Sequence, residues 1–212
     1  RVPRAQGPRF KPNVGKYPFD CMVTDILDMS GKRGATSRGH TKLLVFADSL
    51  SRWVEAIPLK SDPTAEEVMD LFLIHVYSRY GFPREVRSDA GSNIASDLAE
   101  RVHETYDVSM HVGAAHHHES AGLCERVNDT LVGMVRASGG KANDWDEHLP
   151  FVLFAYRATP NRVTKESPAY LLYGRELRSP ATVGLLEGSL PPQEAGEYAR
   201  RMVIRLRAAW DL

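Results

Sequence analysis

Three carboxylates, Asp25, Asp89 and Glu125, are the residues of this 212-residue sequence whose types and settings best fit a chemical site. Asp25 stands near the end of a mostly apolar run, Asp89 follows a short segment expected to be a strand, and Glu125 falls on an expected helix. Hard cations such as Mg²⁺ bind oxygen ligands of this kind and keep several waters. Two such ions about 4 Å apart can stabilise both the attacking and the leaving oxygen of a phosphoryl transfer.

Each of these carboxylates also has an ordinary structural interpretation. Asp25 would then be a strand-end aspartate that accepts backbone hydrogen bonds. Asp89 would be a turn aspartate, which is a frequent feature of loops. Glu125 would be a solvated glutamate on the polar face of its helix. Because the chain has 27 acidic residues, picking three of them does not decide between these interpretations.

A second candidate site is the histidine-rich segment AAHHHESAGLCER, residues 114–126. Imidazole suits zinc and nickel, so His116, His117 and His118 are possible ligands. Adjacent histidines on a loop rarely converge on one ion, however, and structural zinc usually draws on two separated pairs of ligands. Cys124, next to Glu125, is either a reactive thiol or, as we favour, a small, partly buried residue.

Strands and helices that would position these residues follow from the apolar pattern. Three apolar runs, at residues 19–27, 42–47 and 53–59, read as adjacent strands of one sheet. Two further short strands are expected at residues 84–88 and 108–112. Between the first two runs, residues 32–40 are rich in Gly, Ser and basic residues, as in a loop. Strands first, then strands alternating with helices, predict a mixed sheet with helices on its faces.

Helices are predicted at residues 64–80, 96–106, 122–138 and 145–160. Thr64 followed three residues later by Glu67 is a capping box, and Gly81 with Pro83 marks the end of the first helix. In the third, one apolar face is expected, with Glu125 nearly opposite it. The members of that face are Leu123, Val127, Leu131 and Met134.

Bulk composition limits the classes of protein that need to be considered. The content of 42% hydrophobic and 25% charged residues is that of a globular domain, and the 27 basic residues balance the 27 acidic ones. Net charge therefore gives no support for nucleic-acid binding. Cys21 and Cys124 form no disulfide framework and fit a reducing compartment. No apolar run approaches the roughly 20 residues of a membrane span, and no signal peptide is visible, so we expect no membrane partner.

The two ends of the sequence differ from its centre. Residues 1–16 hold five basic residues, no acidic residue and three prolines, which indicates a linker or a basic arm that follows phosphates. Residues 193–211 are expected to form a helix rich in arginine. Because the chain starts at Arg1 without Met, we expect it to be a fragment of a longer protein.

The sequence contains, in this order, the stretches LLVFADSLSRWVEAIPLK, SRYGFPREVRSDAGSNI, GLCERVNDTL, DWDEHLPFVLFAYRATP and SPAYLLYGRELRSP. These five stretches resemble the catalytic core of retroviral-type integrases, most closely those of gypsy-class LTR retrotransposons. With the strand around Asp25, they span most of residues 17–180. The family pattern is two aspartates followed by a glutamate, with 35 residues between the second aspartate and the glutamate. Here 35 residues separate Asp89 from Glu125.

The resemblance implies a fold, a reaction and a set of metal ligands. The fold would be α/β and RNase H-like, a mixed five-stranded sheet flanked by helices. Asp25 would bridge two ions, Mg²⁺ or Mn²⁺. Asp89 would bind one of these ions together with Asp25, and Glu125 would bind the other together with Asp25. The reaction would be 3′-end processing of element DNA by water, followed by attack of the new 3′-OH on target DNA. Catalysis would then consist of positioning and charge neutralisation.

Organisation, partners and location are implied in the same way. Residues 1–16 would link to an upstream zinc-binding module, residues 17–180 would be the catalytic core, and residues 181–212 a C-terminal linker with a basic helix. The protein would bind double-stranded DNA, both element ends and target, as a homo-oligomer in the nucleus, after a cytoplasmic nucleoprotein stage. The residues expected near DNA are Ser92, Asn93, His117, Glu119, Ser120, Arg126 and Asn128.

Several positions depart from the family pattern. His117 matches a family histidine, but His118, Glu119 and Ala121 replace proline, glutamine and asparagine in the expected loop before Glu125. Ala90 stands where glutamine usually follows the second aspartate, and Asp129 where a basic residue is frequent. Glu119 adds negative charge next to phosphates, which weakens binding unless a cation screens it. A decayed or host-adopted domain that binds DNA or a partner without catalysis is therefore the alternative hypothesis.

Overall fold

A mixed five-stranded sheet lies at the centre of the protein. The structure is a computed structural model that describes residues 15–31, 34–88, 93–112, 118–138 and 144–179, and residues 197, 200, 201, 204 and 206; for 118–121 and 124 only the backbone is described. The strand order is β3-β2-β1-β4-β5, with β1, β2 and β3 antiparallel and β4 and β5 parallel to β1. The strands are β1 (Cys21–Asp28), β2 (Lys42–Asp48), β3 (Val54–Leu59), β4 (Glu85–Ser88) and β5 (His111–Val112).

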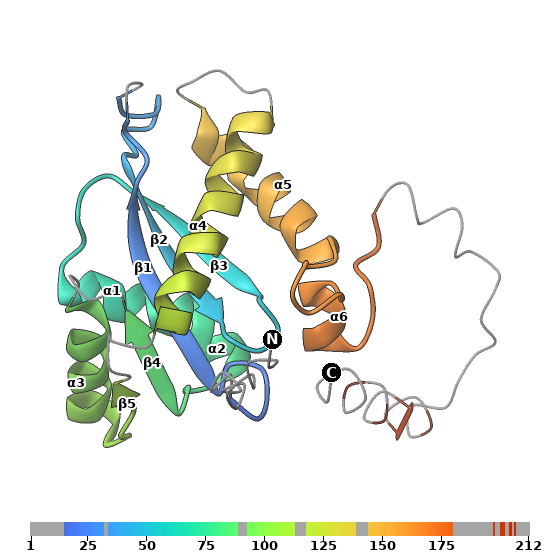
Figure 1. Ribbon diagram of the computed structural model, residues 1–212. Helices are drawn as coiled ribbons and strands as arrows, with labels where there is room; N and C mark the ends of the chain where they lie inside the picture. The colour runs from blue at the N-terminus through green and yellow to red at the C-terminus, as the bar shows by residue number, and fades with distance from the viewer. Residues whose placement is uncertain are drawn as a thin grey trace, which may run out of the picture.

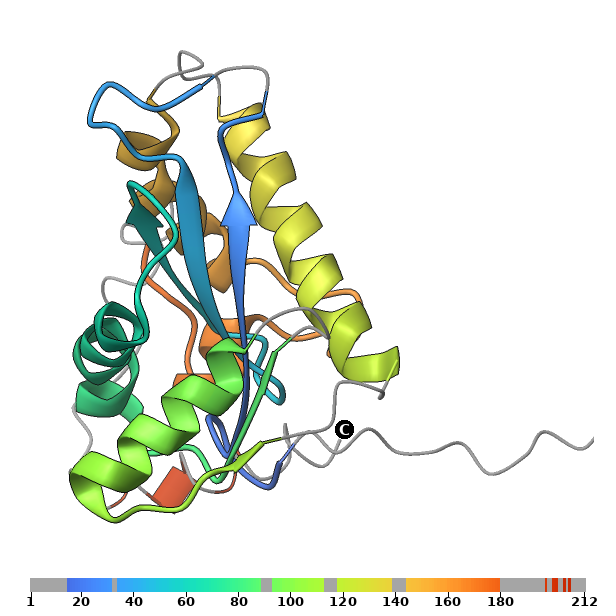
Figure 2. The same cartoon turned by 90° about the vertical axis from the view of Figure 1, so that its left-hand side faces the viewer.

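Helices cover both faces of this sheet (Figures 1 and 2). Figure 2 shows α4 on one side of the strands and α1 with α3 on the other. The helical segments are α1 (Ala65–Phe72), the π-helical η1 (Leu73–Tyr77), α2 (Ser78–Tyr80), α3 (Ile94–Tyr106), α4 (His118–Ala137), α5 (Trp145–Ala158) and α6 (Pro168–Tyr173). The predicted arrangement, a mixed sheet flanked by helices, is confirmed.

The alternation of side chains along β1 and β2 divides the core into two halves, as expected for strands whose successive residues point to opposite faces. One half joins the sheet to α1 and α3, through Met22, Leu44, Phe46, Phe72 and Leu98. The other half joins it to α4 and α5, through Val23, Val45, Leu123, Leu131 and Val152. Since Val23 and Leu27 both belong to the second half, Asp25 between them lies on the face covered by α4.

The first helical segment confirms the predicted capping signals. The Thr64 hydroxyl accepts the Glu67 N–H at 3.2 Å, and the Glu67 carboxylate accepts the Thr64 N–H at 2.7 Å. Gly81 ends the segment with a φ of +82°, a conformation that glycine adopts without steric cost. The π-helical turn in the middle of the segment was not predicted from the sequence.

Two element boundaries differ from the sequence-based expectation. Helix α4 begins at His118 rather than at the predicted residue 122, so residues 118–121, expected as a loop, are helical. Strand β5 is limited to His111–Val112 rather than residues 108–112, and both of its residues are exposed at the edge of the sheet. Beyond residue 179, the described positions 197, 200, 201, 204 and 206 are helical, as expected for the C-terminal segment. No helix within the described ranges combines the length and apolar character that crossing a membrane requires.

Candidate active site

Asp25 lies on the central strand β1, half-buried under α4. Its Oδ1 atom accepts the backbone N–H of Ile26 at 2.8 Å. Its Oδ2 atom accepts a hydrogen bond from the Nδ2 of Asn128 at 2.8 Å. The ordinary interpretation of a backbone-bonded aspartate therefore accounts for one oxygen, while the other connects the strand to α4.

Glu125 lies on α4, one turn before Asn128. The residues Leu123, Val127 and Leu131 are buried against the sheet, which confirms the apolar face predicted for this helix. Asn128 is also buried, with 8% of its surface exposed. Glu125 is exposed and makes no hydrogen bond or ion pair with any described residue. Residues three apart are neighbours on a helix surface, so the Asn128–Asp25 bond brings the turn that carries Glu125 to the Asp25 side of the sheet.

Asp89 itself lies outside the described residues, and its predicted place in the site stays a prediction. The residue before it, Ser88, ends β4 and pairs with Thr24 in parallel register. Thr24 in turn is the residue before Asp25. The two strands that carry Asp25 and lead to Asp89 are therefore adjacent, and their last paired residues immediately precede the two aspartates.

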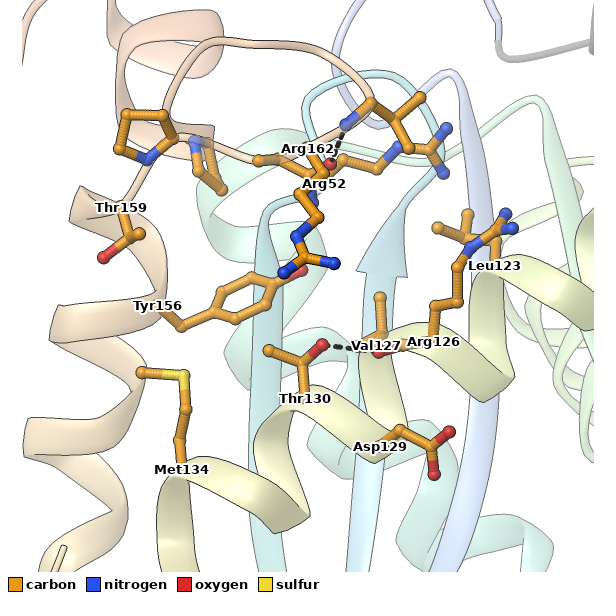
Figure 3. A pocket seen from close by; sticks show the side chains of 14 residues that line it. Arg52, Leu123, Arg126, Val127, Asp129, Thr130, Met134, Tyr156, Thr159 and Arg162 are labelled. Atoms are coloured by element: carbon orange, nitrogen blue, oxygen red, sulfur yellow. Dashed lines mark hydrogen bonds between the residues drawn. The ribbon is translucent and has the colours of Figure 1, made fainter. Parts of the chain in front are cut away.

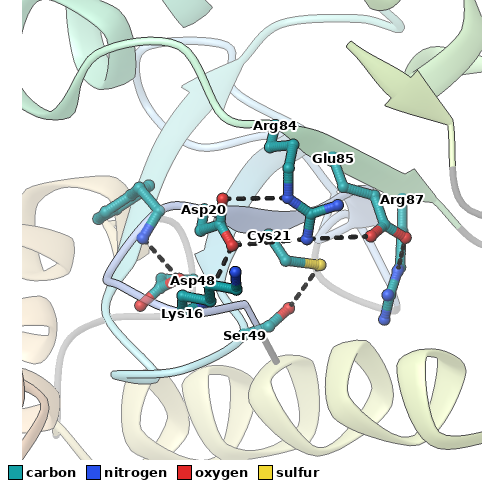
Figure 4. Close-up of polar contacts among 9 residues, drawn as sticks. Lys16, Asp20, Cys21, Asp48, Ser49, Arg84, Glu85 and Arg87 are labelled. Carbon is teal, nitrogen blue, oxygen red and sulfur yellow. Dashed lines mark hydrogen bonds and ion pairs between the residues drawn. The ribbon is translucent and has the colours of Figure 1, made fainter. Parts of the chain in front are cut away.

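A partly exposed polar frame supports this pairing of β1 and β4 at the start of both strands (Figure 4). Arg84 Nε donates to Asp20 Oδ1 at 3.2 Å, and Arg87 Nε donates to Glu85 Oε1 at 2.6 Å. Asp20 precedes β1, and Arg84 precedes β4, so the first ion pair joins the two strand entrances. Fixing the strands at this end sets the register that continues to Thr24 and Ser88.

Two other buried groups belong to the same frame. Asp48 Oδ1 accepts the Phe19 N–H at 2.8 Å, and Asp48 Oδ2 accepts the N–H and hydroxyl of Ser51. The Ser49 hydroxyl donates to the Cys21 sulfur at 3.5 Å, and burial raises the pKa of the Cys21 thiol. Cys21 is therefore a buried structural thiol rather than a reactive one.

The donor set at this site fits a hard divalent cation. Asp25 and Glu125 supply carboxylate oxygens, which Mg²⁺ and Mn²⁺ prefer, and no soft ligand is needed to complete such a site. Among the residues whose positions are described, no three His, Cys, Asp or Glu side chains form a metal-binding group. Asp89, the predicted third ligand, is not among those residues.

Most predicted DNA-contact residues remain untested. Ser92 and His117 lie outside the described residues, as do His116 and Ala90. Glu119 and Ser120 lie in the first turn of α4, where only the backbone is described. Asn93 is exposed directly before α3.

Arg126 and Asn128 are the two predicted DNA-contact residues whose side chains the structure describes on α4. Arg126 is exposed and lines a cavity between α4 and α5. Asn128 is buried and holds Asp25, a role that the helical pattern did not reveal. Its position three residues after Glu125 was the available signal, because the two share one side of the helix.

The sequence of this chain matches a known protein family. The sequence profile of the family described as "Integrase core domain" matches residues 16–124, which is more than half of the 212 residues. The chain belongs to the integrase core domain family. The match includes Asp25 and Asp89 and ends one residue before Glu125, so the helix geometry is the independent evidence for the third carboxylate.

Curated relatives of this integrase core are retroviral polyproteins. The chain is 32% identical over 163 residues to the Gag-Pol polyprotein of avian reticuloendotheliosis virus, covering 76% of this chain and 14% of that protein. It is 32% identical over 160 residues to the Pol polyprotein of feline endogenous virus ECE1, covering 74% of this chain and 14% of that protein. The chain thus spans about one seventh of the length of these relatives and belongs to the retroviral type of the family.

Solved structures show the same fold at lower sequence identity. The simian T-cell lymphotropic virus intasome in complex with PP2A regulatory subunit B56 gamma matches with a TM-score of 0.62 and 20% identity, covering 92% of this chain and 65% of that chain. The HTLV-2 integrase catalytic core domain in complex with magnesium, in a trimeric form, matches with a TM-score of 0.55 and 15% identity. The match covers 75% of this chain and 99% of that chain. These matches confirm the predicted RNase H-like fold.

Proposed function

We propose that this integrase core is a metal-dependent polynucleotidyl transferase that processes the 3′ ends of retroelement DNA and joins them to target DNA. Asp25, Asp89 and Glu125 would be its catalytic residues and would hold two ions, Mg²⁺ or Mn²⁺. The observation that carries the proposal is the 2.8 Å hydrogen bond from Asn128 to Asp25, which brings the turn bearing Glu125 to the central strand. Family membership and the solved HTLV-2 core with magnesium support the same reading.

The protein's own residues would act by positioning. The Ile26 N–H and the Asn128 amide hold the Asp25 carboxylate in one orientation, and a carboxylate held in this way would present its oxygens to a cation. Glu125, exposed and without a described partner, keeps both oxygens for the same purpose. When bound, the ions supply charge neutralisation for the attacking and leaving oxygens of the phosphodiester.

The element, partners and location follow from this proposal. Five sequence stretches resemble gypsy-class elements, and we assign the chain to an LTR retrotransposon of that class. Its substrates would be double-stranded element ends and target DNA, bound by a homo-oligomer, and the reaction would take place in the nucleus. Residues 1–16 and 181–212 would be linkers to flanking domains, and the described Arg200 and Arg201 near the C-terminus are exposed on a helical segment.

Reverse strand transfer on a branched DNA oligonucleotide tests the proposal, because that substrate depends least on flanking domains. With Mn²⁺, the chain should reseal the branch, and Glu125→Gln should lower the rate by at least about 100-fold, as expected when one preorganised charge at a reaction centre is removed. Asp25→Asn and Asp89→Asn should have effects of the same size.

Glu104→Gln is the matched control, because Glu104 is exposed near the end of α3 and plays no part in the proposed site. It should react at the rate of the unaltered chain. Equal activity of Glu125→Gln and Glu104→Gln would contradict the three-carboxylate site. A folded chain without activity in any form would favour the non-catalytic alternative, for which Glu119 and Asp129 are the sequence evidence.

A further inference from the structure

A cavity of about 500 Å³ lies between α4 and α5, next to the turn that joins β2 to β3 (Figure 3). Its volume falls within the range of small-molecule sites. Much of its wall is apolar, and its charged side chains are three arginines and one aspartate. The apolar members include Leu123, Val127, Met134, Pro160, Val163 and Pro168, and the charged ones are Arg52, Arg126, Arg162 and Asp129.

Arg52 is the buried charge of this cavity. Only 8% of its surface is exposed, and its Nε atom is fully buried without a hydrogen-bond partner. Its guanidinium makes no hydrogen bond or ion pair with any residue that the structure describes. Burial lowers the pKa of Arg52, but a guanidinium stays protonated in proteins, so the charge persists. An unpaired buried charge is costly, and among the described residues Asp48 acts on this charge without forming an ion pair with it.

Backbone geometry fixes the direction of this side chain. Arg52 has a φ of +65°, which is uncommon for any residue except glycine. The turn holds it there, since the Arg52 N–H donates to the Asp48 carbonyl at 3.1 Å and Asp48 is itself bound by Ser51. Figure 3 shows the guanidinium extending from this turn into the cavity.

Tyr156, on α5, places a second polar group beside it. Only 6% of Tyr156 is exposed, and its hydroxyl is buried without a partner among the described residues. Figure 3 shows the Tyr156 ring and the Arg52 guanidinium close together at the cavity wall. Burial raises the pKa of Tyr156 to about 12, so the phenol remains a proton donor at neutral pH. Two unsatisfied donors on separate elements thus meet at one place.

We propose that this cavity binds a small organic carboxylate with an apolar body. The planar edge of a guanidinium matches the two oxygens of a carboxylate, and the Tyr156 hydroxyl supplies a further donor. The apolar walls on α4 and in the segment after α5 would bury the rest of the ligand. Arg126 and Arg162 are exposed and would attract anions to the site, whereas Asp129 disfavours a second negative charge on the ligand. Neither Asp25 nor Glu125 lines this cavity, although Arg126, one of the residues expected near DNA, does.

Isothermal titration calorimetry of the full chain with 4-phenylbutyrate tests the proposal. The carboxylate should bind, and its neutral amide, 4-phenylbutyramide, should bind at least about 10-fold more weakly, as expected for a lost charge-assisted hydrogen bond. Equal binding of acid and amide would overturn the assignment, as would the absence of any binding. Inorganic phosphate that competes as strongly as the carboxylate would also overturn it, because the apolar wall would then contribute nothing.

Three variants locate the binding site. Arg52→Met keeps the length of the side chain and should weaken binding about 10-fold or more, and Tyr156→Phe removes one hydroxyl and should weaken it about 3- to 10-fold. Arg101→Met, on α3 across the sheet, should bind like the unaltered chain. Far-ultraviolet circular dichroism checks that each variant is folded. Unchanged binding in folded Arg52→Met and Tyr156→Phe would place the ligand elsewhere and contradict the proposal.

Discussion

Arg52, in the turn before β3, and Glu55, on β3, are both buried charged residues, yet their surroundings differ. The Glu55 carboxylate receives a hydrogen bond from Trp53 Nε1 at 3.0 Å and one from the Tyr80 hydroxyl at 2.7 Å. It also forms ion pairs with two arginines, at 3.2 and 2.7 Å, which are Arg79 and Arg157. Arg52, three residues earlier, has no such partner among the described residues.

This difference separates charges that hold the fold from charges that are available to ligands. Glu55 joins β3 to α2 and α5, and Arg157 also stacks on the Trp53 ring at 4.4 Å and donates to the Val54 carbonyl. Removal of the Glu55 carboxylate would leave several hydrogen-bond donors without an acceptor. Asp25 stands between the two cases, because the Ile26 N–H and the Asn128 amide orient it while it remains only half-buried. Such a carboxylate is positioned by the fold and still able to bind a cation.

The largest expected effect on stability is that of Glu55→Gln. Breaking a buried ion pair by neutralising one partner costs about 3–5 kcal/mol, because the remaining charges lose their compensation. Urea denaturation should show this decrease in the free energy of unfolding. Glu147→Gln is the matched control: Glu147 is exposed and, among the described residues, its carboxylate pairs with Arg38 alone, so its change should stay below about 1 kcal/mol. A Glu55→Gln variant as stable as this control would contradict the conclusion that Glu55 holds the fold.

A smaller effect of opposite sign is expected for Arg52→Met. Removing a buried donor that has no partner should raise the free energy of unfolding by about 1–3 kcal/mol, measured by the same denaturation. The variant would then be more stable and at the same time poorer in carboxylate binding. A clear loss of stability would instead show that the Arg52 guanidinium has a structural partner. That result would contradict its proposed role in binding a carboxylate.

The smallest effect concerns pH and the buried Asp146. Burial raises the pKa of Asp146, but the hydrogen bond and charge of His40, at 2.6 Å, and the Thr36 hydroxyl outweigh it, so the net shift is downward. A lowered pKa means that the carboxylate contributes stability above its unfolded value of about 4, which is lost as the pH falls through the folded value. Denaturation over a range of about pH 2 to pH 6, which spans that pKa, should show a smaller acid-dependent loss of stability in Asp146→Asn. Identical pH profiles would contradict the His40 contact.

Sequence patterns predicted most of the elements that carry the candidate site. Short-range signals were sufficient for the Thr64–Glu67 capping box and for the apolar face of α4, since both depend on spacing within one helix. The start of α4 at His118 was missed, because His118, Ser120 and Gly122 have intermediate or low helix propensity and give no clear helix signal. Spacing alone could not show that Asn128 reaches Asp25, 103 residues earlier in the chain.

The cavity could not be predicted from the sequence. Its walls come from the turn after β2, from α4, and from the end of α5 with the segment that follows, so it exists only through tertiary packing. Nothing in the local sequence indicates that Arg52 adopts a positive φ, since glycine is the usual residue at such a position. Buried donors without partners become visible only when the whole fold is known.

The most direct test of the account measures stability and reverse strand transfer together in Glu125→Gln and Glu55→Gln. We predict that Glu125→Gln keeps the free energy of unfolding within about 0.5 kcal/mol, as is usual for exposed positions, and loses strand transfer. Glu55→Gln should lose stability and, under conditions where it remains folded, retain strand transfer. The opposite result, an active Glu125→Gln chain, would contradict the central claim that Glu125 and Asp25 form one metal-binding site.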